Sequence, residues 1–343
     1  MIERGTAERI LVVEDDESLL RLLERVLRNA GYSEVRGVSD ARQVLPIFRE
    51  WRPELVVADV QMPHLDGIAV MQQLRARLPA GEFLPVLLVT GDVAAETKQR
   101  ALAAGASDFL TKPFDASEVV LRIGTLLALR RAQRELREAV QRVTEQVEQA
   151  HVDAVRRLTM AVKYRNVQGA TDPTLVGELS AHIAGALDLP ADEVERIRLA
   201  APLHDLGMVG IPEEVLGREG SLSLDELDQI REHTSMGARI LTNSESRLIQ
   251  LAEEIALYHH EAWDGSGYTP GLAGDSIPLA ARIVAVADTF CAMTRNRPYQ
   301  TAHSVDDAVA WIESQAGSRF DPEIVRAFLR VAGMGDLALL RRT

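Results

Sequence analysis

Hydrophobic and polar positions follow two different patterns along the chain. Up to about residue 115, short apolar runs at residues 10–13, 55–58 and 86–90 alternate with amphipathic stretches. Such uninterrupted runs are typical of strands that are buried on both faces of a sheet, and the amphipathic stretches between them are typical of helices. The first pattern therefore predicts an α/β domain with a doubly wound parallel sheet.

The middle of the chain favours one long helix. Residues 117–164 contain no proline and a single glycine, Gly124. Apolar residues recur there at spacings of three and four, which is typical of a coiled coil and favours a homodimer. The polar residue Gln146 interrupts this stripe, so a solvated helix in a monomer is the alternative. The stripe consists of Leu129, Ala132, Leu136, Ala139 and Val143.

After residue 172 the periodicity is helical throughout, with little strand-like alternation. The pattern therefore predicts a separate all-α domain. Its expected helices include residues 192–206, 223–241, 246–260 and 278–294.

The composition of the 343-residue chain excludes several classes of protein. No apolar run approaches the roughly 18 to 20 residues of a membrane helix, and the first residues lack a signal peptide's apolar core, so we expect a cytoplasmic protein without membrane contact. A net charge of −13 and the lack of a basic recognition helix disfavour DNA binding. The single cysteine, Cys291, excludes an internal disulfide, so any metal must be held by histidine and carboxylate.

Charged and polar side chains follow the ends of the predicted strands. Glu14 and Asp15 follow the first apolar run, Asp59 follows the second, Thr90 ends the third, and Lys112 follows a further short run. The carboxyl ends of parallel strands meet at one edge of a sheet, where such folds bind ligands. Carboxylates suit Mg²⁺, and one of them can act as a nucleophile that forms an aspartyl phosphate.

The motifs ILVVEDD, VVADVQMPHLDG, VTG and FLTKPF resemble those of bacterial response-regulator receiver domains, over about residues 8–128. The resemblance implies a flavodoxin-like fold, a sensor histidine kinase as partner, and Asp59 as phosphoacceptor. It also implies that Glu14, Asp15 and Asp59 hold Mg²⁺. The switch residues that it implies are Thr90, Phe109 and Lys112.

Histidine and aspartate residues recur in the helical half. Imidazole and carboxylate are ligands of ions such as Fe and Mn, and a carboxylate can bridge two ions, so the set suits a two-metal hydrolase. A lone His-Asp pair is more often a structural hydrogen bond. The set consists of His204, Asp205, His233, His259, His260 and Asp288.

The motifs HDLGMVGIPEEVL, HTSMGARIL, HHEAWDGSGY, RIVAVADTF and RNRPYQTA resemble HD-GYP phosphohydrolases over about residues 158–332. The resemblance implies an all-α HD-type domain, one or two transition-metal ions such as Fe or Mn, and hydrolysis of cyclic di-GMP or a related nucleotide. The substrate-binding residues that it implies are Gly267, Tyr268 and Arg297.

Together the two resemblances predict a two-component response regulator. A receiver domain (residues 1–120) is expected to be joined by a long helical linker (121–157) to an HD-GYP-like output domain (158–343). Phosphorylation of Asp59 would control that domain.

The chain departs from the HD-GYP pattern where the family's first ligand histidine is expected. Asp172 stands there, and Gln168 stands where some members have an extra glutamate ligand. His182 is an alternative ligand, but its interval to His204 is shorter than the family's, so we prefer Asp172. Aspartate is shorter than histidine and carries a charge, so this ion is expected to bind weakly or sit differently.

Further departures concern substrate binding. Met208 and Gln300 replace cations, Cys291 replaces an aspartate, and Thr269 replaces the proline of Gly-Tyr-Pro. Loss of a cation aimed at the phosphate costs on the order of 2 to 4 kcal/mol of barrier. We therefore expect a cyclic di-GMP phosphodiesterase of reduced activity. The alternatives are an inactive module that binds a protein or cyclic di-GMP, and an enzyme for a different phosphorylated nucleotide.

Overall fold

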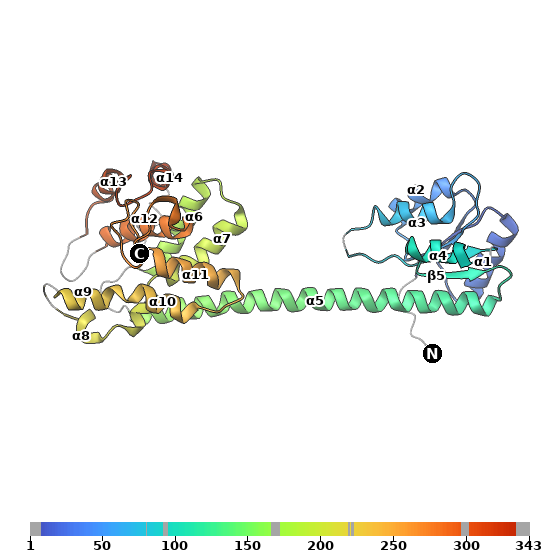
Figure 1. The fold of residues 1–343 in the computed structure, drawn as a ribbon, viewed down its shortest axis with the longest axis horizontal. Helices are drawn as coiled ribbons and strands as arrows, with labels where there is room; N and C mark the ends of the chain where they lie inside the picture. The colour runs from blue at the N-terminus through green and yellow to red at the C-terminus, as the bar shows by residue number, and fades with distance from the viewer. Residues whose placement is uncertain are drawn as a thin grey trace. The chain divides into compact units, whose positions relative to one another are not determined.

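The computed structural model describes residues 8–79, 81–91, 95–165, 172–218, 220, 223–295 and 302–333. The chain divides into two compact units, Met1–Val143 and Thr144–Thr343 (Figure 1). Helix α5, Ala116–Arg165, contributes residues to both units. It confirms the single long helix that its lack of proline predicts.

The first unit contains a five-stranded parallel sheet in the order β2-β1-β3-β4-β5. Chain order and spatial order diverge beside β1, so the ends of β1 and β3 lie at the switch point where such sheets bind ligands. This confirms the predicted doubly wound α/β fold. The strands are β1 (Ile10–Val13), β2 (Val35–Val38), β3 (Leu55–Asp59), β4 (Val86–Thr90) and β5 (Asp108–Thr111).

Helices cover both faces of this sheet, which explains why its central strands are apolar throughout. On β1, Leu11 and Val13 belong to one core, which α2 and α3 complete, and Ile10 and Val12 belong to the other, which α1 and the start of α5 complete. The helices are α1 (Glu17–Asn29), α2 (Val44–Trp51), α3 (Gly67–Arg75) and α4 (Ala95–Ala103).

The second unit is helical, as predicted. Among its described residues, β pairing is limited to one bridge between Ala316 and Phe320. Its core surrounds α12 and includes Val155 and Val162 of α5. The helices are α6 (Pro173–Ala186), α7 (Ala191–Ala200), α8 (Glu213–Leu216), α9 (Leu224–Arg231), α10 (His233–Leu241), α11 (Arg247–Tyr258), α12 (Leu279–Met293), α13 (Val305–Ser314) and α14 (Pro322–Gly333).

Two expected helices end earlier than their apolar pattern predicts. The helix expected over residues 192–206 ends at Ala200 and continues as short 3-10 turns, because Pro202 cannot donate a backbone hydrogen bond. The helix expected over residues 223–241 is divided between α9 and α10. There the side chains of Thr234 and Ser235 bond to the carbonyls of Arg231 and Glu232 and so compete with the backbone of a continuous helix.

Among the described residues, no helix has both the length and the apolar character needed to cross a membrane.

Candidate functional site

Three carboxylates and a lysine meet at the carboxyl edge of the receiver sheet. Glu14 and Asp59 are buried there, and Asp15 is exposed beside them. Each of the three offers an oxygen within 4.8 Å of the others, which is a suitable arrangement for a divalent cation. The Nζ of Lys112 lies 2.9 Å from Glu14 Oε2 and 2.8 Å from Asp59 Oδ2.

The lysine balances part of the buried negative charge. Burial and the nearby Asp59 raise the pKa of Glu14, whereas its hydrogen bond from Lys112 acts in the opposite direction. For Lys112 itself, burial lowers the pKa, but the two carboxylates outweigh burial and raise it overall. An additional cation, or a phosphoryl group that recruits the lysine, would therefore rearrange these ion pairs.

The remaining receiver residues lie on the neighbouring strands. Thr90 is buried at the end of β4, and its carbonyl accepts a hydrogen bond of 2.8 Å from the backbone of Lys112. Phe109 is half-buried on β5. Gly67 opens α3, where any Cβ would overlap with the carbonyl oxygen of Asp59, so only glycine lets the helix approach this strand end so closely.

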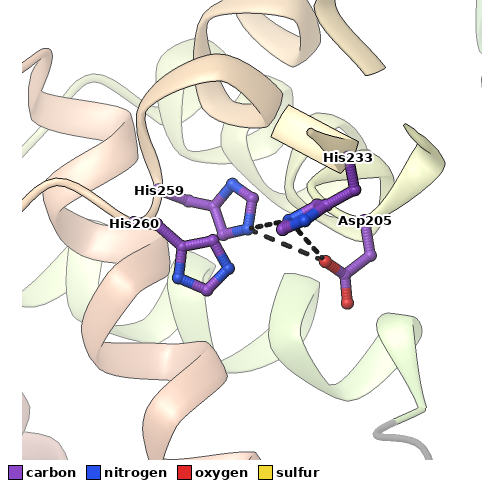
Figure 2. Close-up of side chains that lie close together, drawn as sticks. All are labelled: Asp205, His233, His259 and His260. Carbon is purple, nitrogen blue, oxygen red and sulfur yellow. Dashed lines mark hydrogen bonds and ion pairs between the residues drawn. The ribbon is translucent and has the colours of Figure 1, made fainter. Parts of the chain in front are cut away.

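A second group of ligand-type side chains lies in the helical unit. Asp205 lies between two 3-10 turns, His233 begins α10, and His259 and His260 follow α11. Figure 2 shows the three imidazoles gathered beside Asp205. Each residue offers a ligand atom, and these atoms lie within 4.8 Å of one another.

Backbone carbonyls orient the histidine rings. Nδ1 of His204 lies 2.9 Å from the carbonyl of Ala201, and Nδ1 of His259 lies 3.0 Å from that of Ile255. Nδ1 of His233 lies 2.6 Å from the carbonyl of residue 230. A carbonyl only accepts, so each Nδ1 carries a proton and each Nε2 is the nitrogen that faces the other ligand groups. A hydrogen bond from the second ring nitrogen to a backbone carbonyl is characteristic of metal-binding histidines.

His204 and Asp288 extend this group. The buried Nε2 of His204 makes no hydrogen bond with any described residue, although it lies 3.3 Å from Asp205 Oδ2 and 3.5 Å from Asp288 Oδ1. Burial acts to lower the pKa of His204, but the two carboxylates raise it overall. An unsatisfied buried nitrogen that faces two carboxylates fits a metal ion, which would replace the proton held there.

Burial keeps the imidazoles of His233 and His260 neutral, as metal ligation requires. Desolvation lowers the pKa of His233 despite the nearby Asp205, and it also lowers that of His260. Burial acts to raise the pKa of Asp205, but His204 and His259 outweigh it, so this carboxylate stays ionised. The donor set therefore offers one ionised carboxylate beside the neutral imidazoles of His233 and His260.

Gly207 explains how Asp205 comes so close to His233. A Cβ at Gly207 would overlap with the carbonyl oxygen of His233 and would lie 2.5 Å from the backbone nitrogen of Gly237. Only glycine therefore allows the 3-10 turn to press against the first turn of α10.

A cavity of about 310 Å³ opens beside these residues. Its lining includes His259, His260, Asp288, Gly267 and Tyr268. The Tyr268 ring stacks on His260, with ring centroids 4.7 Å apart. The ligand set therefore faces a space that admits a small molecule.

Comparison with known proteins agrees with both units. Residues 10–124 match the response regulator receiver domain family, and residues 155–324 match the HD domain family. The chain is 38% identical to the cyclic di-GMP phosphodiesterase response regulator RpfG of Xanthomonas campestris pv. campestris, over 94% of this chain and 87% of that protein. The chain belongs to the receiver–HD response regulators. It is also 32% identical to a cyclic di-GMP phosphodiesterase of Thermotoga maritima, over 94% of this chain and 90% of that protein.

A match over a shorter part of the chain carries a different substrate in its name. The chain is 36% identical to the 3'3'-cGAMP-specific phosphodiesterase 2 of Vibrio cholerae, over 52% of this chain and 34% of that protein. The names of these relatives therefore include two different cyclic dinucleotides, cyclic di-GMP and 3'3'-cGAMP.

Asp172 lies outside the group of ligand atoms in the HD domain. It caps the N-terminus of α6, where its Oδ1 accepts from the backbone of Thr174 at 3.1 Å. Its Oδ2 lies 2.7 Å from Nζ of Lys163 on α5. Both oxygens are thus engaged by other partners. His182, the alternative ligand, is also outside the group, and its Nδ1 lies 2.7 Å from the carbonyl of Glu178.

The other departures from the HD-GYP pattern differ in their surroundings. Cys291 is buried in the core of α12, and burial raises its thiol pKa, which fits an unreactive packing residue. Met208 is half-buried in the 3-10 turn after Asp205. The expected residues Gln168, Arg297 and Gln300 lie outside the described residues.

Thr269 has an unusual backbone angle in the Gly-Tyr loop. Its φ is 98°, a conformation that is rare for any residue with a Cβ and is closed to proline, whose ring fixes φ near −65°. Its hydroxyl lies 2.6 Å from that of the buried Thr234, next to His233. The loop therefore has a different anchor from one that contains proline.

The sequence did not single out three residues near the HD-domain group. Lys163 pairs with Asp172, as described above. Glu261 is buried, with Oε2 lacking a hydrogen-bond partner among the described residues, and Arg319 lines the cavity. Glu261 directly follows the His-His pair in the sequence, so its position near the ligands could have been predicted. Arg319 is brought there by the tertiary fold, and no local pattern reveals it.

Metal content will test the ligand assignment. Replacing His260 with alanine removes an imidazole from the set, so we expect the apparent affinity for Mn²⁺ to fall by at least about tenfold. Asp172→Asn keeps the helix cap, and we expect it to leave the affinity unchanged. The Mn²⁺ affinity of each variant is measured by calorimetric titration of the metal-stripped full chain. His182→Ala is the matched control. The assignment would be contradicted if His182→Ala lost as much affinity as His260→Ala.

Proposed function

We propose that this chain is a metal-dependent phosphodiesterase, under the control of its receiver domain, that hydrolyses cyclic di-GMP. The supporting observation is the convergence of Asp205, His233, His259 and His260, whose ligand atoms lie within 4.8 Å of one another, beside a cavity of about 310 Å³ that His259 and His260 line. The names of the relatives that match nearly the whole chain agree with this substrate.

One or two transition-metal ions such as Fe or Mn are proposed for this site. Asp205, His233, His259 and His260 would hold one ion. His204, Asp205 and Asp288 would hold the other. Asp172 is left out of this set, because its oxygens pair with Lys163 and Thr174. When bound, such ions supply a water of lowered pKa and a positive charge for the phosphate.

The protein's own residues would orient the substrate. Tyr268 would contact the substrate from the cavity wall, where its ring stacks on His260. Gly267 also lines the cavity, and it lets this loop fold back onto residues 260–262, because a Cβ there would meet their backbone. Arg297 is proposed as a phosphate-binding cation on the strength of the family motif alone.

In the receiver, Asp59 is proposed to accept a phosphoryl group from a histidine kinase. Its carboxylate oxygen would form a bond to phosphorus while the bond from phosphorus to the donor breaks. Glu14, Asp15 and Asp59 would hold Mg²⁺. Lys112 would leave its present ion pairs for the phosphoryl oxygens, Thr90 would bind a further oxygen, and Phe109 would reorient.

Phosphorylation can be tested with acetyl phosphate and Mg²⁺. We expect the wild-type chain to gain one phosphoryl group in intact-protein mass spectrometry, and Asp59→Asn to gain none, because its amide is not a nucleophile. Asp66→Asn is the matched control, since Asp66 also follows β3 but caps α3. Continued labelling of Asp59→Asn would show that the acceptor lies elsewhere.

Reduced activity is the proposed consequence of the altered pocket. Met208 and Gln300 provide no charge where the family has cations, and Asp172 is engaged by Lys163. The same observations favour a second candidate, an inactive module that binds cyclic di-GMP or a partner protein. A third candidate is an enzyme for a related nucleotide.

Turnover separates these candidates. With Fe²⁺ or Mn²⁺, we expect slow conversion of cyclic di-GMP to a linear product, and loss of that product in His260→Ala. Met208→Lys restores a cation and should raise kcat/KM by at least about tenfold. Leu224→Lys, at an exposed site on α9, adds the same charge as a control. Binding without product from either the wild-type chain or Met208→Lys would establish the inactive module instead.

A homodimer through α5 is proposed as well. Apolar side chains on this helix stay exposed at heptad spacing, with Leu136 65% and Val143 57% exposed. Arginine and glutamate alternate around them, so two copies of the same helix can pair charges of opposite sign.

The association state tests this surface. Leu136→Glu combined with Val143→Glu places charge in the seam, so the mass from light scattering should fall by about half, to that of a monomer. Leu121→Glu, on an exposed part of the same helix outside the stripe, should leave the mass unchanged. A wild-type mass equal to one chain would reject the dimer.

A further inference from the structure

Arg319 is a cation that the HD-GYP motifs do not account for. It lies in the loop between α13 and α14 and lines the same cavity as His259, His260 and Asp288. Among the described residues that line the cavity, it is the only lysine or arginine. The other charged groups in that lining are acidic or belong to the metal-ligand set.

Two aromatic rings hold the guanidinium. Its central carbon lies 5.8 Å from the centroid of Trp311 and 5.6 Å from that of Phe320. Contacts of this length are favourable cation–π interactions, and they use the face of the guanidinium rather than its N–H groups. No carboxylate in the described part of the chain lies within ion-pair distance of it. Its donors therefore remain available to an anion.

The backbone ties this segment to the loop that follows the histidine ligands. The carbonyl of Arg319 accepts from the backbone of Trp263 at 3.1 Å, and that of Ser318 accepts from Asp264 at 2.8 Å. The position of Arg319 at the cavity is thus coupled to the loop that carries Gly267 and Tyr268, although Arg319 itself comes from a different part of the sequence.

The charges of the cavity separate two binding regions. Metal ions at the histidine and aspartate ligands would neutralise one phosphate. The remaining acidic lining groups, Glu261 and Asp264, accept hydrogen bonds from the backbones of Gly271 and Ser266. A ligand with a second phosphate needs another cation, and Met208 does not provide the one that the family has.

We propose that Arg319 binds the second phosphate of a cyclic dinucleotide whose first phosphate lies at the metal ligands. Arg319 would thereby select dinucleotides over simple phosphodiesters. This inference rests on the proposed phosphodiesterase function and adds a specificity residue to it.

Two substrates test the inference on the full chain loaded with Mn²⁺. Cyclic di-GMP has two phosphates, and bis(4-nitrophenyl) phosphate has one. For Arg319→Gln we expect KM for cyclic di-GMP to rise by about tenfold or more, with its kcat and both constants for the simple diester nearly unchanged. Arg319→Lys should recover part of the loss. Arg326→Gln, on the exposed face of α14, is the matched control.

The outcomes separate the inference from the function on which it rests. Unchanged KM for cyclic di-GMP in Arg319→Gln, with an active wild-type chain, overturns the inference alone. Equal losses on both substrates also overturn it, because they indicate a structural role. If the wild-type chain binds cyclic di-GMP without turnover, the same variants are compared by calorimetry, with the same tenfold loss expected. A wild-type chain that neither binds nor cleaves cyclic di-GMP overturns the proposed function, and the inference with it.

Discussion

The HD-domain site depends on hydrogen bonds between imidazole Nδ1 atoms and backbone carbonyls near helix ends. The carbonyls of Ala201 and Ile255 also accept the backbone N–H of His204 and His259, and the helices stop or change at these points and at residue 230. Each carbonyl holds its imidazole through Nδ1, and this bond fixes the orientation and the tautomer of the ring. The helix breaks that the hydrophobic pattern did not predict are therefore part of how the ligands are directed.

Much of the receiver could be predicted because its constraints are local in sequence. Strand ends such as Glu14 and Asp59 meet wherever parallel strands align, so an apolar run followed by an acid already places the side chain. The pairing of Lys112 with both carboxylates follows from the same edge. The sequence could not predict how closely Lys112 approaches each of the two carboxylates. The strength of each ion pair depends on burial and on distances within about one ångström.

The HD domain was predictable in its ligand types but less so in their geometry. The motifs predicted that His204, Asp205 and the three further histidines belong to one set of metal ligands. The structure places their side chains together. Asp172 shows that a matching motif position does not determine what a side chain binds. It stands at the position of the family's ligand histidine, but its shorter side chain caps α6 and pairs with Lys163. Arg319 shows the opposite case, since tertiary packing alone brings it to the cavity.

The backbone at Thr269 also limits which residues this position of the pocket can accept. A φ of 98° is closed to proline, and the neighbouring hydroxyl of Thr234 has no counterpart in a proline side chain. A proline at position 269 would therefore meet both a forbidden backbone angle and the loss of an anchor beside His233. Restoring the family residue at this position requires a change in the backbone of the loop as well as in the side chain.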